Sequence, residues 1–356
     1  MAERPLTCGF QIAYMRLITS CSDALVPGVT RRLLLTVLAT LAPAVAASPA
    51  GATGHTPQGV KASANVGIVD IYTTLGYVHG IAAGTGMIIS RSGEVLTNNH
   101  VIEGATKFKV VDVTTHHRYT ATVVGYSVSR DIAVLQLAHA SGLRTVKRGG
   151  AIPLHVQMHV VARGNAQGRG GQPKVARGQI LALHQQIVAK DEGGDSETLH
   201  NVIATDAPVV PGYSGGPLEN SQNRVLGVVT AGSTSGFPRG FAIPLKQALQ
   251  LARRIESGRG NAVVHVGPTA FLGVELKDVS AGAKIFSVVP GKPADVAGLG
   301  KGDVITSLNS KKISSVADVR KRVLTLVPGK AVPIGWTDTS GTAQTGTITP
   351  ISGPPQ

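Results

Sequence analysis

From residue 65 onward, apolar and polar positions alternate in short runs that glycine and proline interrupt. The runs 86–90 and 94–97 flank Arg91-Ser92-Gly93, which is the pattern of two strands joined by a hairpin turn. Many short strands with few helices are typical of β-barrels, although the alternation alone establishes only an all-β domain. Further strands are predicted at 107–112, 119–126, 132–137, 157–163, 175–183 and 225–231.

One segment near the end of this region has the spacing of an amphipathic helix. Pro244 suits a first helical turn, and Gly258 suits the position after the last turn. The residues that form one apolar stripe between them are Leu245, Ala248, Leu249, Ala252 and Ile255. We therefore expect the first domain to span 65–258 and to end in a helix, which a short basic linker, 258–263, follows.

A second, smaller unit of strands and helices is expected over 264–352. Ser315 and Asp318 form a capping box, which is a common start of a helix. From the pattern alone, this unit is a small α+β domain. The apolar positions of its helix, which would line the core or a groove, are Val316, Val319, Val323 and Leu326.

The first 47 residues have the composition of an export signal. Arg31-Arg32 precedes the apolar run 33–46, which ends in the small residues Ala44-Val45-Ala46 that a signal peptidase reads. The run is short and contains a proline, so an uncleaved membrane anchor is the minor alternative. Residues 30–34 also resemble a twin-arginine signal, and either export route stays open.

The segment before this signal, residues 1–28, is unusual for a signal peptide. A translation start at Val26 or Val29 would leave a conventional one, so the printed start is open to question. Residues 48–64 are rich in Ala, Gly, Ser and Pro and are interpreted as a flexible linker.

Composition adds two constraints on the exported part. Both cysteines, Cys8 and Cys21, precede the expected cleavage site, so the mature chain would fold without disulfides. The net charge is +14, and the predicted signal removes only four basic and two acidic residues, so the mature chain stays basic. Attraction to anionic cell-envelope polymers is consistent with this charge. Aromatic residues make up 4% and no nucleic-acid motif is present, so no specific nucleic-acid partner is expected.

The chemistry is concentrated in the hexamer 212–217, Gly-Tyr-Ser-Gly-Gly-Pro. A serine hydroxyl becomes a nucleophile only when a base takes its proton, and the oxyanion that follows needs N–H donors already in place. Ser214 is the candidate nucleophile, and the amides of Gly212 and Ser214 are the candidate donors. A glycine-rich turn without function is the alternative for this hexamer alone.

Two upstream segments supply the partners that such a serine needs. His100 ends the strand-like run before it, and Asp131 precedes an apolar run that would carry its carboxylate inward. An imidazole base oriented by a carboxylate completes a triad, and the order His100, Asp131, Ser214 is that of chymotrypsin. The other ten histidines are interpreted as surface or core residues.

Taken together, these segments resemble the HtrA/DegP family of trypsin-like serine proteases, and in particular its secreted PepA-type members. The family's fold is an all-β two-barrel trypsin-like protease domain followed by an α+β PDZ domain, with the triad between the barrels. No cofactor and no metal are expected, and family members are often trimeric. The further segments that carry the resemblance are 84–89, 205–207, 240–244 and 264–273.

The resemblance also implies a substrate pocket. Pro208 stands where trypsin carries an aspartate, so a small or medium apolar side chain is expected before the cleaved bond. The strand formed by Thr230, Ala231 and Gly232 is expected to pair with the substrate backbone.

The family pattern has one departure, Tyr213, where relatives carry Asn or Asp. A tyrosine is larger and could either pack over the loop or distort the oxyanion hole. We expect Tyr213→Asn to preserve or raise proteolysis.

The resemblance further implies that Leu272, Gly273 and Val274 belong to the carboxylate-binding loop of a PDZ domain. The strand 274–279 would receive an extended peptide.

The leading hypothesis is therefore an exported serine endopeptidase that cleaves unfolded or envelope proteins, with a PDZ domain that binds C-terminal peptides or regulates the protease. The alternative is a catalytically weak or silent peptide-binding protein of the envelope. A basic envelope- or nucleic-acid-binding protein is a third hypothesis.

Overall fold

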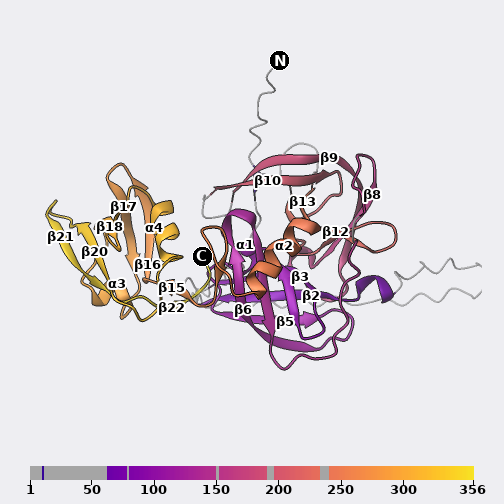
Figure 1. Ribbon diagram of the computed structural model, residues 1–356, viewed down its shortest axis with the longest axis horizontal. Coiled ribbons are helices and arrows are strands. Elements are labelled where there is room, and N and C mark those ends of the chain that lie inside the picture. Colours follow the sequence, from indigo (N-terminus) through magenta and orange to yellow (C-terminus); the bar gives the residue numbers. More distant parts are fainter. Residues whose placement is uncertain (1–9, 12–61, 78–79, 150–151, 191–195, 233–239) are drawn as a thin grey trace, which may run out of the picture.

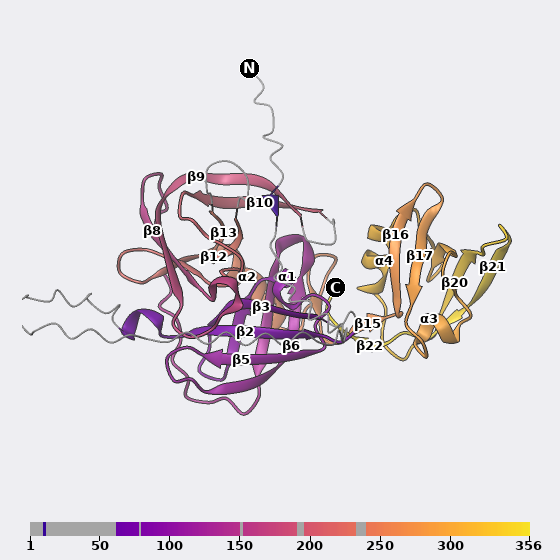
Figure 2. The same cartoon turned by 180° about the vertical axis from the view of Figure 1, so that it is seen from behind.

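The computed structural model describes residues 10–11, 62–77, 80–149, 152–190, 196–232 and 240–356. Almost all of the predicted export signal, and most of the linker 48–64, lie outside these residues. The described chain forms two β-barrels side by side and a smaller unit of strands and helices at one end of the molecule (Figures 1 and 2).

The first barrel is a sheet that closes on itself, because β6 pairs with β7 as well as with β5. In β2, Val69 and Ile71 belong to the barrel core, whereas Asp70 points to the other face. A two-residue strand, β14 (His265–Val266), adds to the edge of β6. The ring runs through β6 (Arg118–Ser127), β5 (Lys107–Asp112), β2 (Ile68–Leu75), β3 (Gly80–Ile88), β4 (Glu94–Thr97) and β7 (Ile132–Leu137).

The second barrel closes in the same way, through the pairing of β8 with β9. β9 is longer than the predicted strand 175–183, and its far half extends beyond the barrel as a hairpin with β10. β1 (Phe10–Gln11) pairs in parallel with the end of β9. The ring runs through β9 (Lys174–Lys190), β10 (Ser196–Thr205), β13 (Gly240–Pro244), β12 (Val225–Gly232), β11 (Pro217–Glu219) and β8 (His159–Gly164).

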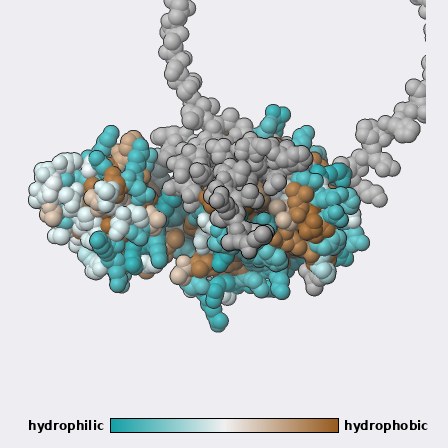
Figure 3. Space-filling model, turned by 90° about the horizontal axis from the view of Figure 1, so that it is seen from above, coloured by the Kyte–Doolittle hydropathy of each residue, from teal (hydrophilic) through white to brown (hydrophobic). Residues whose placement is uncertain are grey.

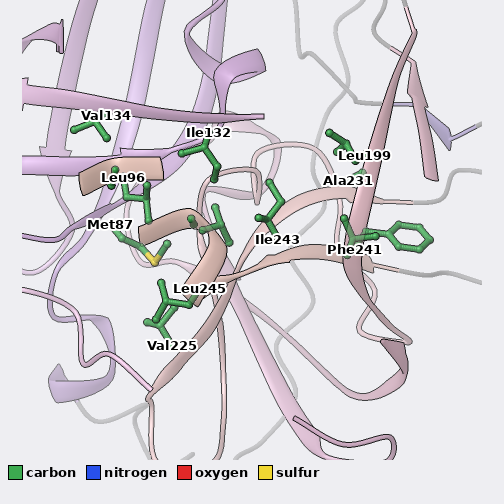
Figure 4. Packing of buried hydrophobic residues seen from close by; sticks show 14 of the residues in the cluster. Met87, Leu96, Ile132, Val134, Leu199, Val225, Ala231, Phe241, Ile243 and Leu245 are labelled. Atoms are coloured by element: carbon green, nitrogen blue, oxygen red, sulfur yellow. The ribbon is translucent and has the colours of Figure 1, made fainter. Parts of the chain in front are cut away.

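An apolar core lies between the two barrels and is covered by α2 (Leu245–Glu256). Met87 and Leu96 enter it from the first barrel, and Phe241 and Ile243 enter it from the second (Figure 4). The apolar stripe predicted for this helix is confirmed, because four of its residues are buried and Leu249 packs against the same core. Pro244 does not start the first turn as predicted. It caps the helix from the last position of β13.

The smaller unit has its own core and is joined to the barrels near two short strands, β15 (Thr269–Phe271) and β22 (Ile351–Gly353). The capping box is confirmed in part, because Ser315 Oγ accepts a hydrogen bond from Asp318 N at 3.2 Å. Its main sheet and helices are β16 (Val274–Val279), β17 (Gly282–Val288), β18 (Val304–Leu308), β19 (Lys311–Lys312), β20 (Val332–Thr337), β21 (Ala343–Ile348), α3 (Pro293–Val296) and α4 (Val316–Val323).

Where Figure 3 is coloured, hydrophilic and intermediate residues surround a hydrophobic patch on the right of the view. No helix among the described residues is long and apolar enough to span a membrane. The remaining short helices are η1 (Ala62–Asn65), η2 (Val128–Arg130) and η3 (Ala166–Gly168).

Candidate active site

His100 lies in α1 (Asn99–Ile102), a helix of one turn that follows β4. The prediction that His100 ends a strand is wrong, because the strand stops at Thr97 and the chain then turns into this helix. His100 is buried, and its backbone N–H donates to Asp131 Oδ1 at 3.0 Å. This contact ties the helix to the loop that carries Asp131.

Asp131 lies between η2 and β7, with a left-handed backbone conformation (φ 48°) that a short polar side chain tolerates. Its carboxylate oxygens lie 3.0 and 2.9 Å from Nδ1 of His100. Its carbonyl accepts a hydrogen bond from Asn98 Nδ2 at 2.7 Å. Because Asp131 is only 2% exposed, an isolated carboxylate there would be costly, and the imidazole supplies the partner.

Ser214 lies in the loop between β10 and β11, and both barrels hold this loop. Ser214 O accepts from Thr85 N at 2.8 Å, and Thr85 Oγ1 donates to Gly212 O at 2.6 Å. From the second barrel, Val229 O accepts from Gly215 N at 2.8 Å. The position of the serine is therefore set by β3 on one side and by β12 on the other.

Two glycines of this loop have conformations and neighbours that exclude a side chain. At Gly212 (φ +93°) a Cβ atom would lie 2.0 Å from Asn165 O, and at Gly215 (φ +83°) it would lie 2.0 Å from Thr85 O. Backbone oxygens cannot move away as a flexible side chain could. Glycine is thus required at both positions for the loop to pack this closely.

The peptide group between Pro211 and Gly212 is oriented by the neighbouring loop 165–171. Gln167 N donates to Pro211 O at 2.7 Å, and in a trans peptide the following N–H points the opposite way. Within the described part of the chain, neither Gly212 N nor Ser214 N donates to another protein group. Both predicted donors therefore remain available to a ligand oxygen.

Thr230 links Asp131 to Ser214, a role that the sequence analysis did not assign to it. The pairing of β12 with β13 shifts register between Val229 and Ala231, so Thr230 sits in a bulge. Bulges next to active sites redirect side chains. Here the Thr230 hydroxyl donates to Asp131 Oδ2, and the Thr230 carbonyl accepts from Ser214 Oγ at 3.4 Å.

Tyr213 is buried, with 4% of its surface exposed, and belongs to the core of the second barrel. A Cβ atom added to Gly164 would lie 2.6 Å from the backbone Cα of Tyr213 and 3.2 Å from its ring, so this glycine lets β8 approach the nucleophile loop closely. Burial raises the pKa of the Tyr213 hydroxyl above its usual value. The side chain is therefore a packing element of the barrel.

The predicted substrate pocket is only partly described. Pro208 is exposed, and Thr230 and Ala231 are buried in β12, which ends at Gly232. The residues that follow, 233–239, lie outside the described part. β11 pairs with β12 only as far as Val228, so within the described chain no strand pairs with Thr230–Gly232 on that side.

The predicted carboxylate-binding loop, Leu272, Gly273 and Val274, connects β15 to β16. Gly273 has a positive φ of 81°, and a Cβ atom there would lie 2.4 Å from Lys292 Cβ. Its carbonyl accepts from Val289 N at 2.8 Å. β16 follows directly and is an edge strand, because it pairs only with β17 among the described strands.

Comparison with known proteins decides the family. A trypsin-like peptidase domain model matches residues 84–228, and a PDZ domain model matches residues 270–337. The serine protease PepD of Mycobacterium tuberculosis is 34% identical over 332 residues, which cover 86% of this chain and 69% of that protein. The chain belongs to the HtrA/DegP family of serine proteases. Its fold, an all-β trypsin-like domain with a PDZ domain, is the one expected from the sequence.

Other relatives in the family are longer than this chain. A probable periplasmic serine protease do/HhoA-like of Haemophilus influenzae is 39% identical over 269 residues, 71% of this chain and 55% of the relative. The periplasmic serine endoprotease DegP of Escherichia coli is 35% identical over 271 residues, 72% of this chain and 54% of the relative. The chain thus spans about half the length of these two proteins. A solved structure, the HtrA-type protease AlgW with tripeptide, aligns with a TM-score of 0.47 and 26% identity, over 83% of this chain and 97% of that one.

One buried acid near the site, Asp70, does not belong to any of the sequence motifs of this serine protease family. Asp70 is 2% exposed and lies directly across the β2–β3 pair from Thr85, the residue that holds Ser214 and Gly212. Burial raises the pKa of Asp70 to about 7, and only a backbone hydrogen bond from Gly171 opposes this shift. The alternation of side chains along β2 places Asp70 on the face away from the barrel core, and this could be read from the sequence. The burial of Asp70 by the neighbouring loop could not. Within the described residues, no group of His, Cys, Asp and Glu could hold a metal ion.

Proposed function

We propose that this HtrA/DegP-family protease is an endopeptidase in which Ser214 attacks the peptide carbonyl, His100 transfers the proton and Asp131 orients the imidazole. The observation that supports these roles most directly is the pair of contacts between Asp131 and His100 Nδ1, at 3.0 and 2.9 Å. With Nδ1 turned to the carboxylate, Nε2 is the ring nitrogen left for the serine proton. The Thr230 hydroxyl donates to Asp131 and would help to hold the carboxylate against the imidazole.

The oxyanion would be bound by the amides of Gly212 and Ser214. The hydrogen bond from Gln167 N to Pro211 O supports this assignment. It fixes the peptide group between Pro211 and Gly212, so that the Gly212 N–H points away from the Pro211 carbonyl. Donors that are already oriented need no rearrangement when negative charge develops on the substrate.

The substrates we propose are unfolded or envelope polypeptides that bind in an extended form. The open side of Thr230–Gly232 is suited to pair with a substrate backbone. Pro208 offers no charge to a substrate side chain, which favours small or medium apolar residues before the cleaved bond. PDZ binding of a peptide carboxylate by Leu272, Gly273 and Val274 is part of the same proposal, since these residues precede an open edge strand.

Export completes the proposed function. The Haemophilus and Escherichia relatives are named periplasmic proteases, and the basic export-signal pattern of residues 1–47 supports a secreted or envelope location for this chain too. We further propose boundaries of 65–258 for the protease domain and 264–352 for the PDZ domain, with residues 264–266 of the latter packed on the first barrel and the core between the barrels. We also propose assembly of a homo-oligomer such as a trimer. Association with anionic envelope polymers would follow from the positive charge.

Labelling with a fluorophosphonate probe tests the catalytic roles in a purified chain from residue 48 to 356. We expect the probe to label the parent at Ser214, and we expect Ser214→Ala to lose both labelling and casein cleavage. The turnover loss should be on the order of 10⁶, since the serine and its base act as a unit. Casein bound without cleavage by an unlabelled parent, across several pH values, would instead favour the peptide-binding alternative.

A further inference from the structure

The three residues after β22 lie against the helix that carries His100. Pro354 and Pro355 are buried, and Pro355 O accepts a hydrogen bond from Gly104 N at 2.9 Å. Gln356 O accepts from Asn99 Nδ2 at 3.0 Å. We call residues 354–356 the strap. It contacts the first residue of α1, Asn99, and also Gly104, which lies shortly after the helix ends.

The strap is also fixed from the side of the barrel. Gln356 N donates to Tyr126 Oη at 3.2 Å, and the same hydroxyl lies 3.0 Å from Thr269 Oγ1 of β15. Tyr126 is fully buried in the first barrel, and β15 pairs with β22 directly before the strap. These contacts fix the direction of the chain after β22. Where the strap lies against α1, Pro355 O, Gln356 N and Gln356 O are all hydrogen-bonded.

The helix needs such support because it is too short to be stable alone. A single turn forms few internal hydrogen bonds, and nucleating a helix is unfavourable. Its N-cap, Asn98, makes no capping hydrogen bond, and its side-chain Nδ2 donates to Asp131 O. Asn99 is 3% exposed, and its Oδ1 has no partner among the described residues, so the bond from its Nδ2 to Gln356 O is what anchors this buried side chain.

We propose that the strap is a positioning element of the protease, which holds α1 and so keeps His100 in register with Asp131 and Ser214. Asn99 is the positioning residue through which it acts. The inference rests on the proposed catalytic role of His100. It assigns to the segment that follows the PDZ domain a direct structural part in the protease site.

A chain that ends at Gly353 tests the proposal, because β22 is kept and only the strap is lost. We expect casein turnover, as kcat, to fall on the order of tenfold or more with little change in KM, since small displacements of a catalytic group cost rate rather than binding. Asn99→Ala should reproduce most of this loss in the full chain. Ser352→Ala, an exposed change in β22, is the matched control and should leave kcat unchanged. A truncated chain with parental kcat would overturn the proposal.

Combining the two changes separates a positioning role from general destabilisation. Asn99→Ala should add little to the truncated chain, because both changes remove the same contact, whereas independent weakening would make their effects add. Hydrogen exchange of the His100 amide, which is bonded to Asp131, should accelerate at least tenfold on truncation. Unchanged exchange overturns the strap proposal whether or not the protein cleaves casein, and an unlabelled parent overturns only the proposed function.

Discussion

At the scale of single residues, the site depends on side chains whose contacts could not be predicted from the residues next to them in the sequence. Thr230 is predicted to pair with the substrate, and in addition its hydroxyl contacts Asp131 and its carbonyl contacts Ser214. Asp70 and Thr85 carry no catalytic motif of their own, yet Thr85 bonds to both Gly212 and Ser214 of the nucleophile loop. Positions of this kind are set by burial and by contacts between barrels.

Tyr213 is another residue whose role is set by burial. Its place in the core of the second barrel adds a cost in stability to the replacement Tyr213→Asn. Tyr213→Asn would leave a cavity in the second barrel and place an amide among apolar neighbours, so we expect a loss of roughly 2–4 kcal/mol in unfolding free energy. Urea unfolding measures it, and Tyr213→Phe, which keeps the ring, is the control. Proteolysis at low temperature should persist in the folded fraction. A stable but inactive Tyr213→Asn protein would show instead that the tyrosine shapes the oxyanion hole.

Asp70 makes stability depend on pH. Its pKa is about 7 in the folded protein, compared with a reference value of 3.8. Between these values the folded state keeps a proton that the unfolded state has lost, so the contribution of Asp70 to stability falls as the pH rises. We expect Asp70→Asn to be close to neutral at pH 4 and to stabilise the protein by on the order of 1–3 kcal/mol at pH 8.

Urea unfolding of the parent and of Asp70→Asn at both pH values measures this difference. Thr73→Val, a change on the same strand that removes no titrating group, should show no such pH dependence. An equal effect of Asp70→Asn at pH 4 and pH 8 would contradict the assignment.

At the scale of elements, the loop before β16 is the part of the PDZ domain most constrained by its backbone. Gly273→Ala would place a Cβ atom 2.4 Å from Lys292 Cβ at a positive φ, so the loop must move. We expect the affinity for an apolar C-terminal peptide to fall about tenfold or more, measured by fluorescence polarisation. Gly291→Ala tests positive φ alone, because nothing lies within 4 Å of its Cβ position.

The free carboxylate of the peptide provides a second comparison. If the loop captures it, an amidated peptide should bind the parent on the order of tenfold more weakly or worse. Equal binding of the two peptides would mean that recognition is by strand pairing alone.

At the scale of the whole molecule, the protease and PDZ domains share elements. β14 belongs to the sheet of the first barrel, although the sequence analysis placed residues 265–266 in the PDZ domain. Val264 is 2% exposed in the core between the barrels, and the ring of Tyr77 stacks on Phe271 with centroids 4.4 Å apart. The domain junction is thus part of the protease core.

This sharing predicts that the exact end of a protease fragment matters. A fragment ending at Pro268 keeps Val264 and β14, whereas one ending at Val263 loses both. We expect the longer fragment to be more stable by about 1.5–3 kcal/mol, the contribution of one buried valine side chain, plus any gain from strand pairing. Thermal unfolding of the two fragments measures it. Both lack the strap, so equal stability would show that neither Val264 nor β14 contributes.

The sequence by itself determined that the first domain is all-β, and its resemblance to a known family indicated the two-barrel fold and the class of chemistry. Short alternating runs predicted the strands, the stripe after Pro244 predicted α2, and the hexamer around Ser214 with His100 and Asp131 indicated a serine protease. The strand and helix features are local, because each depends on residues within one turn, strand or loop, whereas the triad was indicated by the order of three separate motifs along the chain. Local periodicity and turn chemistry are read directly from the order of side chains.

Only the tertiary structure decided how distant segments support the site. The bulge that turns Thr230 to Asp131, the burial of Asp70 beside Thr85, the packing of Tyr213 and the contact of Gln356 with Asn99 all join segments far apart in the chain. Such contacts depend on how strands register and how barrels pack, and no local pattern encodes them. The physical reason is that burial and hydrogen bonding are properties of the folded surroundings, which many different neighbouring sequences can supply.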